Sequence, residues 1–175
     1  MDRLTDGLVT ADDEVLLVYD RTAPELYRYA SRLTGGDRQQ TQDLVQDTYV
    51  HLIQRVRDGR VDPQQIAIGW LIQSCRQRYL EQIRQQRRRR SREQRAGGLR
   101  IVSDDAMPAG GDTTAALAAL TPEHRTVLVL RYVDDLPVGD IARIIGRSVR
   151  ATESLLVRAR AALRDSATTS QGGRS

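Results

Sequence analysis

The segment 120–164 constrains the fold most, because turn residues divide it into three runs of helical periodicity. Gly146 separates the last two runs, and a sharp turn between helices needs a residue that adopts a positive φ cheaply. Ala142 lies four residues earlier and is small enough to let two helices cross closely. The expected helices begin at Pro122, cover 138–145, and run from Val149 to about Arg164. This spacing predicts a helix-turn-helix, whose second helix lies in the DNA major groove.

Caps and charges around the turn support the same prediction. Thr121 and Ser148 are hydroxyl residues at the expected N-caps of the first and third helices. The expected shared core consists of Ile141, Ile145, Val149 and Leu156. The alternative is an ordinary pair of packed helices in a bundle. The basic outer face of the last helix argues for DNA instead, and it carries Arg147, Arg150 and Arg158.

The positive charge of the chain is concentrated in one stretch. The formal net charge of the 175 residues is +4, and every basic residue is arginine. Residues 76–100 hold ten arginines against Glu81 and Glu93. A block of this kind attracts polyanions, although a solvated face without a partner is the alternative.

Several classes of protein are disfavoured by what the sequence lacks. Cys75 is the single cysteine, and His51 and His124 stand far apart, so we expect no disulfide, no metal site and no cofactor. The N-terminus has no apolar run, and no stretch approaches the roughly 18 apolar residues of a membrane span. We therefore expect a cytoplasmic protein that makes no membrane contact.

Helical patterns also fill the first half of the chain. We expect a short helix over 12–19, a second from Pro24 to Gly35, a third over 37–57 and a long fourth from Ile68. One arc of the fourth helix is the expected core face: Ile68, Leu71, Ile72, Cys75, Tyr79 and Ile83. The opposite side carries Leu80, Trp70, Gln73, Gln77, Arg84 and Arg88. Trp70 either stacks on a base or packs in the core.

The stretch 96–112 has no periodicity and reads as a flexible linker. Fully extended, its seventeen residues reach at most about 60 Å. That length equals the rise of roughly 17 DNA base pairs. The predicted fold is therefore all-α, with two small helical domains. The expected parts are a domain over 12–95, the linker over 96–112, a domain over 113–165 and a disordered tail over 166–175.

Four motifs in order resemble alternative sigma factors of the extracytoplasmic-function class. These are the helix 25–35, the run DLVQDTY at 43–49, the Trp70-Leu71-Ile72 helix with Arg76 and Arg84, and the helix-turn-helix preceded by 128–132. Such proteins consist of sigma regions 2 and 4 on a flexible linker. The resemblance covers about residues 14–164.

The resemblance implies a factor that binds core RNA polymerase, at the clamp helices of the largest subunit and the flap of the second-largest, and directs promoter recognition, DNA melting and transcription initiation. The implied polymerase contacts are Asp43, Gln46, Asp47, Tyr49 and His51. The implied contacts to the single-stranded −10 element are Arg57, Arg60, Gln64, Trp70, Gln73, Arg76, Gln77 and Arg84. The implied contacts to the duplex −35 element are Arg147, Ser148, Arg150, Ala151, Ser154 and Arg158. An anti-sigma protein or the expression level would supply control.

The chain departs from the family pattern at several positions. Gln77 and Glu81 stand where Asn and Asp are usual. Thr152 replaces a buried aliphatic residue, Glu153 replaces a cation, and Leu155 and Val157 replace groups that could meet DNA or solvent. The two apolar residues could pack on the preceding helix or face a partner.

Two other functions fit parts of the sequence. One is a stand-alone helix-turn-helix regulator that binds duplex DNA as a dimer, but the linker is too flexible to fix the spacing of half-sites. The other is an enzyme that uses Asp43, Asp47 and His51, which share one helix. No further ligands converge there, so we expect no catalytic residues.

Overall fold

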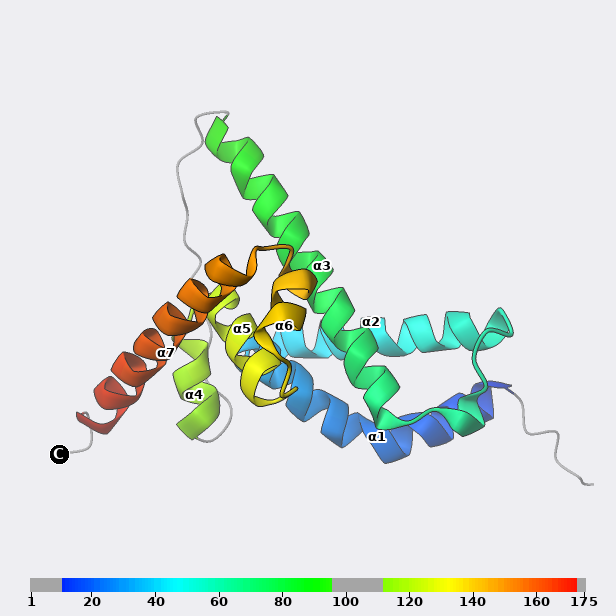
Figure 1. Cartoon of the computed structure of the whole chain (residues 1–175). Helices are drawn as coiled ribbons and strands as arrows, with labels where there is room; N and C mark the ends of the chain where they lie inside the picture. The colour runs from blue at the N-terminus through cyan, green and yellow to red at the C-terminus, as the bar shows by residue number, and fades with distance from the viewer. Residues whose placement is uncertain (1–10, 96–111, 173–175) are drawn as a thin grey trace, which may run out of the picture.

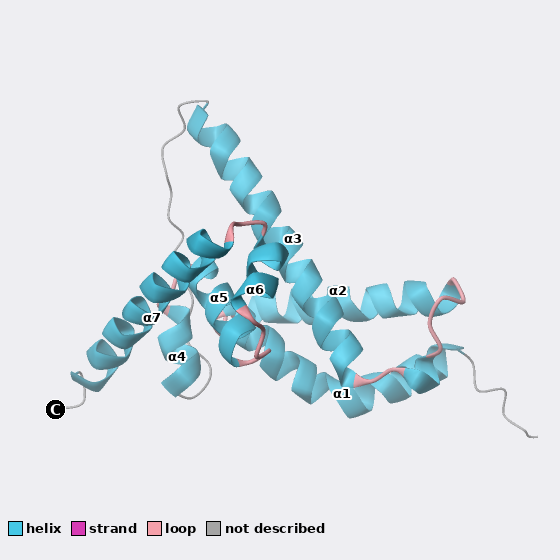
Figure 2. Cartoon of the chain, viewed as in Figure 1, coloured by secondary structure: helices cyan, strands magenta, loops and turns pink. Residues whose placement is uncertain are grey.

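The computed structural model describes residues 11–95 and 112–172, and both parts are helical (Figures 1 and 2). The prediction of an all-α fold with two small helical domains is confirmed. The first half consists of α1 (Ala11–Thr34), α2 (Arg38–Arg57), the short 3-10 helix η1 (Pro63–Gln65) and α3 (Ile68–Arg95). The second half consists of α4 (Asp112–Ala118), α5 (Pro122–Tyr132), α6 (Val138–Ile145) and α7 (Val149–Gly172). Most of the predicted linker lies outside the described residues.

The two helices predicted over 12–19 and from Pro24 to Gly35 form one continuous helix, α1. α1 continues through Pro24, although an internal proline removes a backbone hydrogen bond. The reason is that the buried positions on both sides of Pro24 face the same core, whereas Pro24 itself is exposed. Thr22 also fixes the helix there, because its hydroxyl group lies 2.8 Å from that of Tyr49 on α2.

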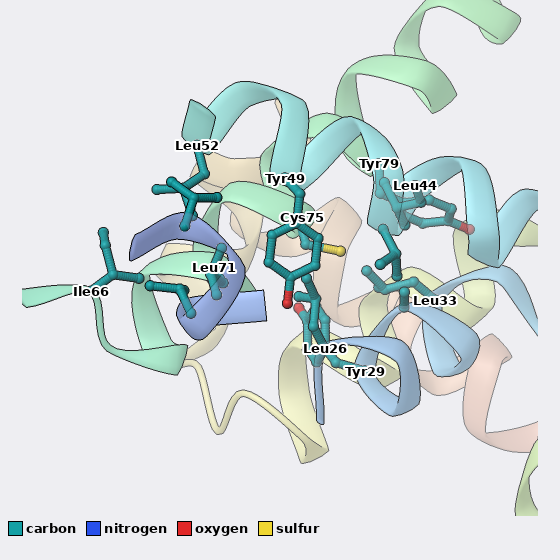
Figure 3. Packing of buried hydrophobic residues seen from close by; sticks show 14 of the residues in the cluster. Leu26, Tyr29, Leu33, Leu44, Tyr49, Leu52, Ile66, Leu71, Cys75 and Tyr79 are labelled. Atoms are coloured by element: carbon teal, nitrogen blue, oxygen red, sulfur yellow. The ribbon is translucent and has the colours of Figure 1, made fainter. Parts of the chain in front are cut away.

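The helices α1, α2 and α3 enclose the first core (Figure 3). Figure 3 shows side chains from all three helices in one cluster with Cys75 near its middle, and Ile66 of the loop at its edge. Leu71, Cys75 and Tyr79 of the predicted core arc are buried, and Ile68, Ile72 and Ile83 are half-buried against the cluster. Burial raises the pKa of the Cys75 thiol to about 12.

The helices α4 to α7 enclose a second core. Gly146 adopts a φ of 67° between α6 and α7, so the predicted turn is confirmed. The hydroxyl groups of Thr121 and Ser148 accept hydrogen bonds from the backbone N–H groups of His124 and Ala151, as expected for N-caps.

Two expectations for the last helix are wrong. Val149 does not join the core but is 49% exposed, at the first position of α7. The core position one turn later is Thr152, which is fully buried with its hydroxyl donating to the Ser148 carbonyl. The helix also continues to Gly172, beyond the expected end near Arg164, so residues 166–172 are not a disordered tail.

The second half packs against the first, with α4 and α5 on α1 (Figure 1). Val129 of α5 belongs to the first core. Leu80, expected on the outer side of α3, is 7% exposed because it lines the contact with the second half. The contact therefore covers a part of α3 that helical periodicity assigned to solvent.

One arginine lies at the centre of this contact. Arg125 of α5 is 7% exposed, and its guanidinium group donates to the Leu117, Ala118 and Leu120 carbonyls at 2.9 to 3.3 Å. The same group donates to the Leu33 carbonyl of α1 at 3.3 Å. It thereby satisfies carbonyls at the C-terminal ends of both α1 and α4, where helices leave them without partners.

Replacing Pro24 by alanine should stabilise the protein. Alanine can restore the backbone hydrogen bond to the Asp20 carbonyl, so we expect the free energy of unfolding to rise by about 1–2 kcal/mol. Urea unfolding measures the difference. The matched control is Glu25→Ala, at an exposed neighbour in the same helix. A loss of stability in Pro24→Ala would show that the proline fits a distorted backbone that alanine cannot support.

Replacing Gly35 by alanine should disrupt the contact between the halves. Gly35 has a φ of 73°, and a Cβ atom there would lie 2.6 Å from Arg125 Nη2. The control is Gly59→Ala, because Gly59 has a φ of 66° but open space around it. Both variants suffer backbone strain, whereas the Gly35 variant should lose about 2 kcal/mol more in urea unfolding. Equal losses would contradict the close packing of Arg125.

Candidate functional site

The exposed face of α2 carries most of the predicted polymerase contacts. Asp43, Gln46 and Asp47 are exposed, and Val50 follows them on the same face of the helix. Val50 is 44% exposed and was missed by the sequence reasoning, although its spacing from Asp43 and Asp47 was visible. The face is thus polar with one apolar residue, as expected of a surface that binds a partner reversibly.

Tyr49 does not belong to this face. Its side chain points into the first core (Figure 3), where its ring centroid lies 4.8 Å from that of Tyr19. Burial raises the pKa of Tyr49. Tyr49 therefore positions α2 from inside, and the predicted direct contact has no exposed surface to make it.

His51 lies between α2 and α3. Its ring is stacked on Trp70 with centroids 6.2 Å apart and planes 7° from parallel. Trp70 is half-buried and packs against the first core. Of the two roles considered for it, base stacking and core packing, the structure shows the packing. Burial lowers the pKa of His51, and the charges of Arg78 and Arg55 lower it further. These effects favour the neutral form of the His51 imidazole.

The loop between α2 and α3 holds further predicted DNA contacts. Asp62 caps η1 by accepting from the Gln64 backbone N–H at 2.9 Å, and Arg21 of α1 donates to the Ile66 carbonyl at 2.8 Å. The predicted residues Arg57, Arg60, Gln64, Gln73 and Gln77 are all exposed along this loop and the first turns of α3. The Gln64 side chain also donates to Glu14 of α1 at 2.8 Å, so the loop is held to α1 through both Ile66 and Gln64.

Two predicted −10 contacts are engaged by the second half instead. Arg76 Nη1 lies 2.9 Å from Asp134 Oδ2, in the loop between α5 and α6. Arg84 donates to the Ile144 carbonyl at the end of α6 at 2.5 Å and lies 3.7 Å from Glu81. Sequence spacing gave no sign of either contact, because the partners are 58 and 60 residues away.

The predicted −35 residues form a stripe on the first turns of α7. Arg150, Ser154 and Arg158 are exposed at four-residue spacing, and the Ser154 hydroxyl donates to the Arg150 carbonyl. Ser148 is also exposed, whereas Ala151 is half-buried. The DNA major groove is wide enough to admit an α-helix, so side chains in such an exposed stripe can reach base edges.

Two residues near the stripe have different surroundings. Arg147 is half-buried and pairs with Glu123 of α5 at 2.9 Å, so it braces the helix-turn-helix. Leu155 is buried in the second core beside α3, whereas Val157 is 56% exposed. Of the two options for these apolar residues, internal packing therefore applies to Leu155 alone.

The described residues offer little for other chemistries. No helix in the described ranges is long and apolar enough to cross a membrane. Within the same ranges, no three His, Cys, Asp or Glu side chains gather in a way that could hold a metal ion. Asp43 and Asp47 lie on an exposed helical face rather than in an enclosed site.

Comparison with known proteins identifies the class. Residues 18–89 match the sequence model of sigma-70 region 2, and residues 112–163 match that of sigma-70 region 4. The fold is similar to that of the sigma factor RpoE from Bartonella quintana, solved in complex with the anti-sigma factor NepR. That chain is 25% identical, the TM-score is 0.52, and the match covers 86% of this chain and 94% of that one.

The chain belongs to the sigma-70 family, in the extracytoplasmic-function class. It is therefore an alternative sigma factor that binds core RNA polymerase and promoter DNA in transcription initiation. The alternative of a stand-alone regulator does not account for the match of residues 18–89 to sigma-70 region 2. Sigma factors in general act by directing the polymerase and are not enzymes.

Proposed function

We propose that the two halves divide the work of promoter recognition. The half over 12–95 binds core polymerase and the −10 element, and the half over 113–165 reads the −35 element. The observation that carries this division is the order of the two sigma regions, with an exposed polar face on α2 and a basic stripe on α7.

The polymerase contact is assigned to Asp43, Gln46, Asp47 and Val50, with His51 at its edge. The −10 strand is assigned to the outward polar residues of the loop and of α3, where arginines neutralise phosphates and make binding strongly salt-dependent. The −35 duplex is assigned to Arg150, Ser154 and Arg158, with the Ser148 hydroxyl at the start of the helix. An arginine that meets a guanine edge contributes about 1–3 kcal/mol of discrimination.

The same proposal covers the location of the protein and its regulation. It acts in the cytoplasm without catalytic activity of its own, since polymerase and DNA are its partners. An anti-sigma protein is a suitable regulator, because the related Bartonella factor was solved with one.

In vitro transcription tests the proposal as a whole. Purified protein is added to sigma-free core polymerase with fragmented genomic DNA, and the 5′ ends of transcripts are sequenced. Discrete new start sites should appear and define both promoter elements. Specific duplex binding by the isolated protein without initiation would contradict the assigned roles.

Replacing Gln46 and Asp47 together by arginine should abolish binding to core polymerase without unfolding the protein. Both side chains are exposed, so the core is untouched, while the charge of the docking face is reversed. Co-purification with core enzyme measures the loss. The control is Asp20→Arg, a similar charge change at an exposed site on α1. Undiminished co-purification of the double variant would place the polymerase contact elsewhere.

Replacing Arg150 by alanine should weaken transcription by an amount that depends on the −35 sequence. Removal of an arginine that reads a base edge costs about 1–3 kcal/mol of binding free energy at its preferred base and less at other bases. The control is Arg160→Ala, since Arg160 is an exposed arginine of the same helix that lies outside the predicted stripe. Run-off transcription from a set of −35 variants measures the pattern. A uniform loss would assign Arg150 to the phosphate backbone.

A further inference from the structure

The exposed face of α7 holds two residues that the basic stripe does not explain. Val157 is 56% exposed, although it follows Leu155 and Leu156, which are 3% and 5% exposed. Glu153 is exposed one helical turn before Val157. Within the described part of the chain, Glu153 makes no ion pair or hydrogen bond with another side chain. The folded protein therefore gives neither side chain an internal task.

Both residues lie on the side of α7 that is assigned to the −35 duplex. An α-helix turns about 100° per residue, so Val157 lies only about 20° around the axis from Arg150. On the same count Glu153 lies about 40° to one side of Val157 and Ser154 about 60° to the other. Ala159, which is fully buried, lies about 160° from Val157. A helix that presents Arg150 and Ser154 to base edges therefore presents Val157 and Glu153 as well.

We propose that Glu153 and Val157 select pyrimidines in the −35 element. Glu153 accepts a hydrogen bond from the N4 amino group of a cytosine, and Val157 packs on the C5 methyl group of a thymine. These two groups distinguish cytosine and thymine from the other bases in the major groove. The inference rests on the proposed function of α7 and adds the kind of base that this helix prefers.

The side chain of Val157 suits a methyl group. It has no polar atom, and the thymine methyl is the apolar group that the base pairs show in the major groove. A valine in a helix is held almost entirely in one χ1 rotamer, so little conformational entropy is lost when its two methyl groups meet the base. Contact with thymine also removes exposed apolar surface from water, which is favourable.

The side chain of Glu153 suits cytosine, because an ionised carboxylate only accepts hydrogen bonds. Guanine shows two acceptors in the major groove, and adenine shows an acceptor beside its amino group, so both repel a carboxylate. Cytosine shows a donor alone. Arg150 stands three residues before Glu153 on neighbouring helix positions, and its positive charge reduces the repulsion between the carboxylate and the DNA phosphates.

The plainer account is a solvated carboxylate beside a scattered surface valine. That account fits the free protein but not the complex, because a duplex on the stripe covers both side chains. A covered carboxylate without a donor loses its water and repels phosphates, which weakens binding to every sequence. A cytosine amino group offsets this cost only where the sequence matches. Glu153 therefore acts chiefly by rejecting other bases, which is a recognised route to specificity.

Uracil tests the role of Val157, because it differs from thymine only by the missing methyl group. The full chain is assembled with core polymerase, and each thymine of the −35 element mapped by the transcription assay is replaced in turn by uracil. We expect wild-type holoenzyme to lose about fourfold in affinity at one thymine, the equivalent of about 0.8 kcal/mol. Val157→Ala should be insensitive to uracil there. The control Val133→Ala removes an exposed valine outside α7 and should keep the sensitivity.

A change of base preference tests the role of Glu153. Each cytosine of the −35 duplex is replaced in turn by adenine, with thymine opposite. Wild-type holoenzyme should lose about tenfold in affinity at one position, the scale of one charge-assisted hydrogen bond. Glu153→Gln should prefer adenine at that position, because a glutamine amide both donates to and accepts from the adenine edge. The control is Asp135→Asn, which removes the same charge from a side chain that is 97% exposed in the same half.

The two base profiles decide the proposal. A uniform gain in affinity that Glu153→Gln shares with Asp135→Asn, without a change of preferred base, would assign Glu153 to general repulsion and overturn its reading role. Uracil sensitivity that persists in Val157→Ala, or that is absent from the wild type at every thymine, would overturn the role of Val157. Failure of the proposed function is separate, because wild-type holoenzyme would then not initiate from the unsubstituted promoter.

Discussion

The arrangement of this protein depends on one buried guanidinium group. Arg125 donates to carbonyls at the C-terminal ends of α4 and α1, which carry partial negative charge and lack partners within their helices. Burial lowers the pKa of Arg125, but arginine remains a cation in proteins. Gly35 leaves the space for this group. Without it, the contact between the two halves would bury unsatisfied carbonyls on both sides.

Around this centre the molecule keeps two apolar cores, and the contact between the halves combines polar pairs with buried apolar side chains such as Val129 and Leu80. Each core contains its own helices, and Val129 is the residue of α5 that reaches into the first core.

Much of the fold was predictable because it depends on local chemistry. Gly146, Thr121 and Ser148 act within one turn of their own positions, so their roles follow from residue type and spacing. Pro24 misled the prediction, since its local cost is outweighed by the shared core on both sides of it. The candidate surfaces were predictable where the side chains face solvent, as on α2 and α7. The burial of Tyr49 was not foreseen, because a motif does not tell which of its residues point inward.

The sequence by itself determined the helices, the turn between α6 and α7, and the family, because periodicity, caps and motifs are properties of neighbouring residues. Only the tertiary structure decided the surroundings of Leu80, Arg76 and Asp134. Their partners are dozens of residues away across a linker without periodicity, and no local pattern encodes such a contact. The identity of an arginine shows that it can bind an anion, but the fold decides whether that anion is a phosphate or the protein's own carboxylate.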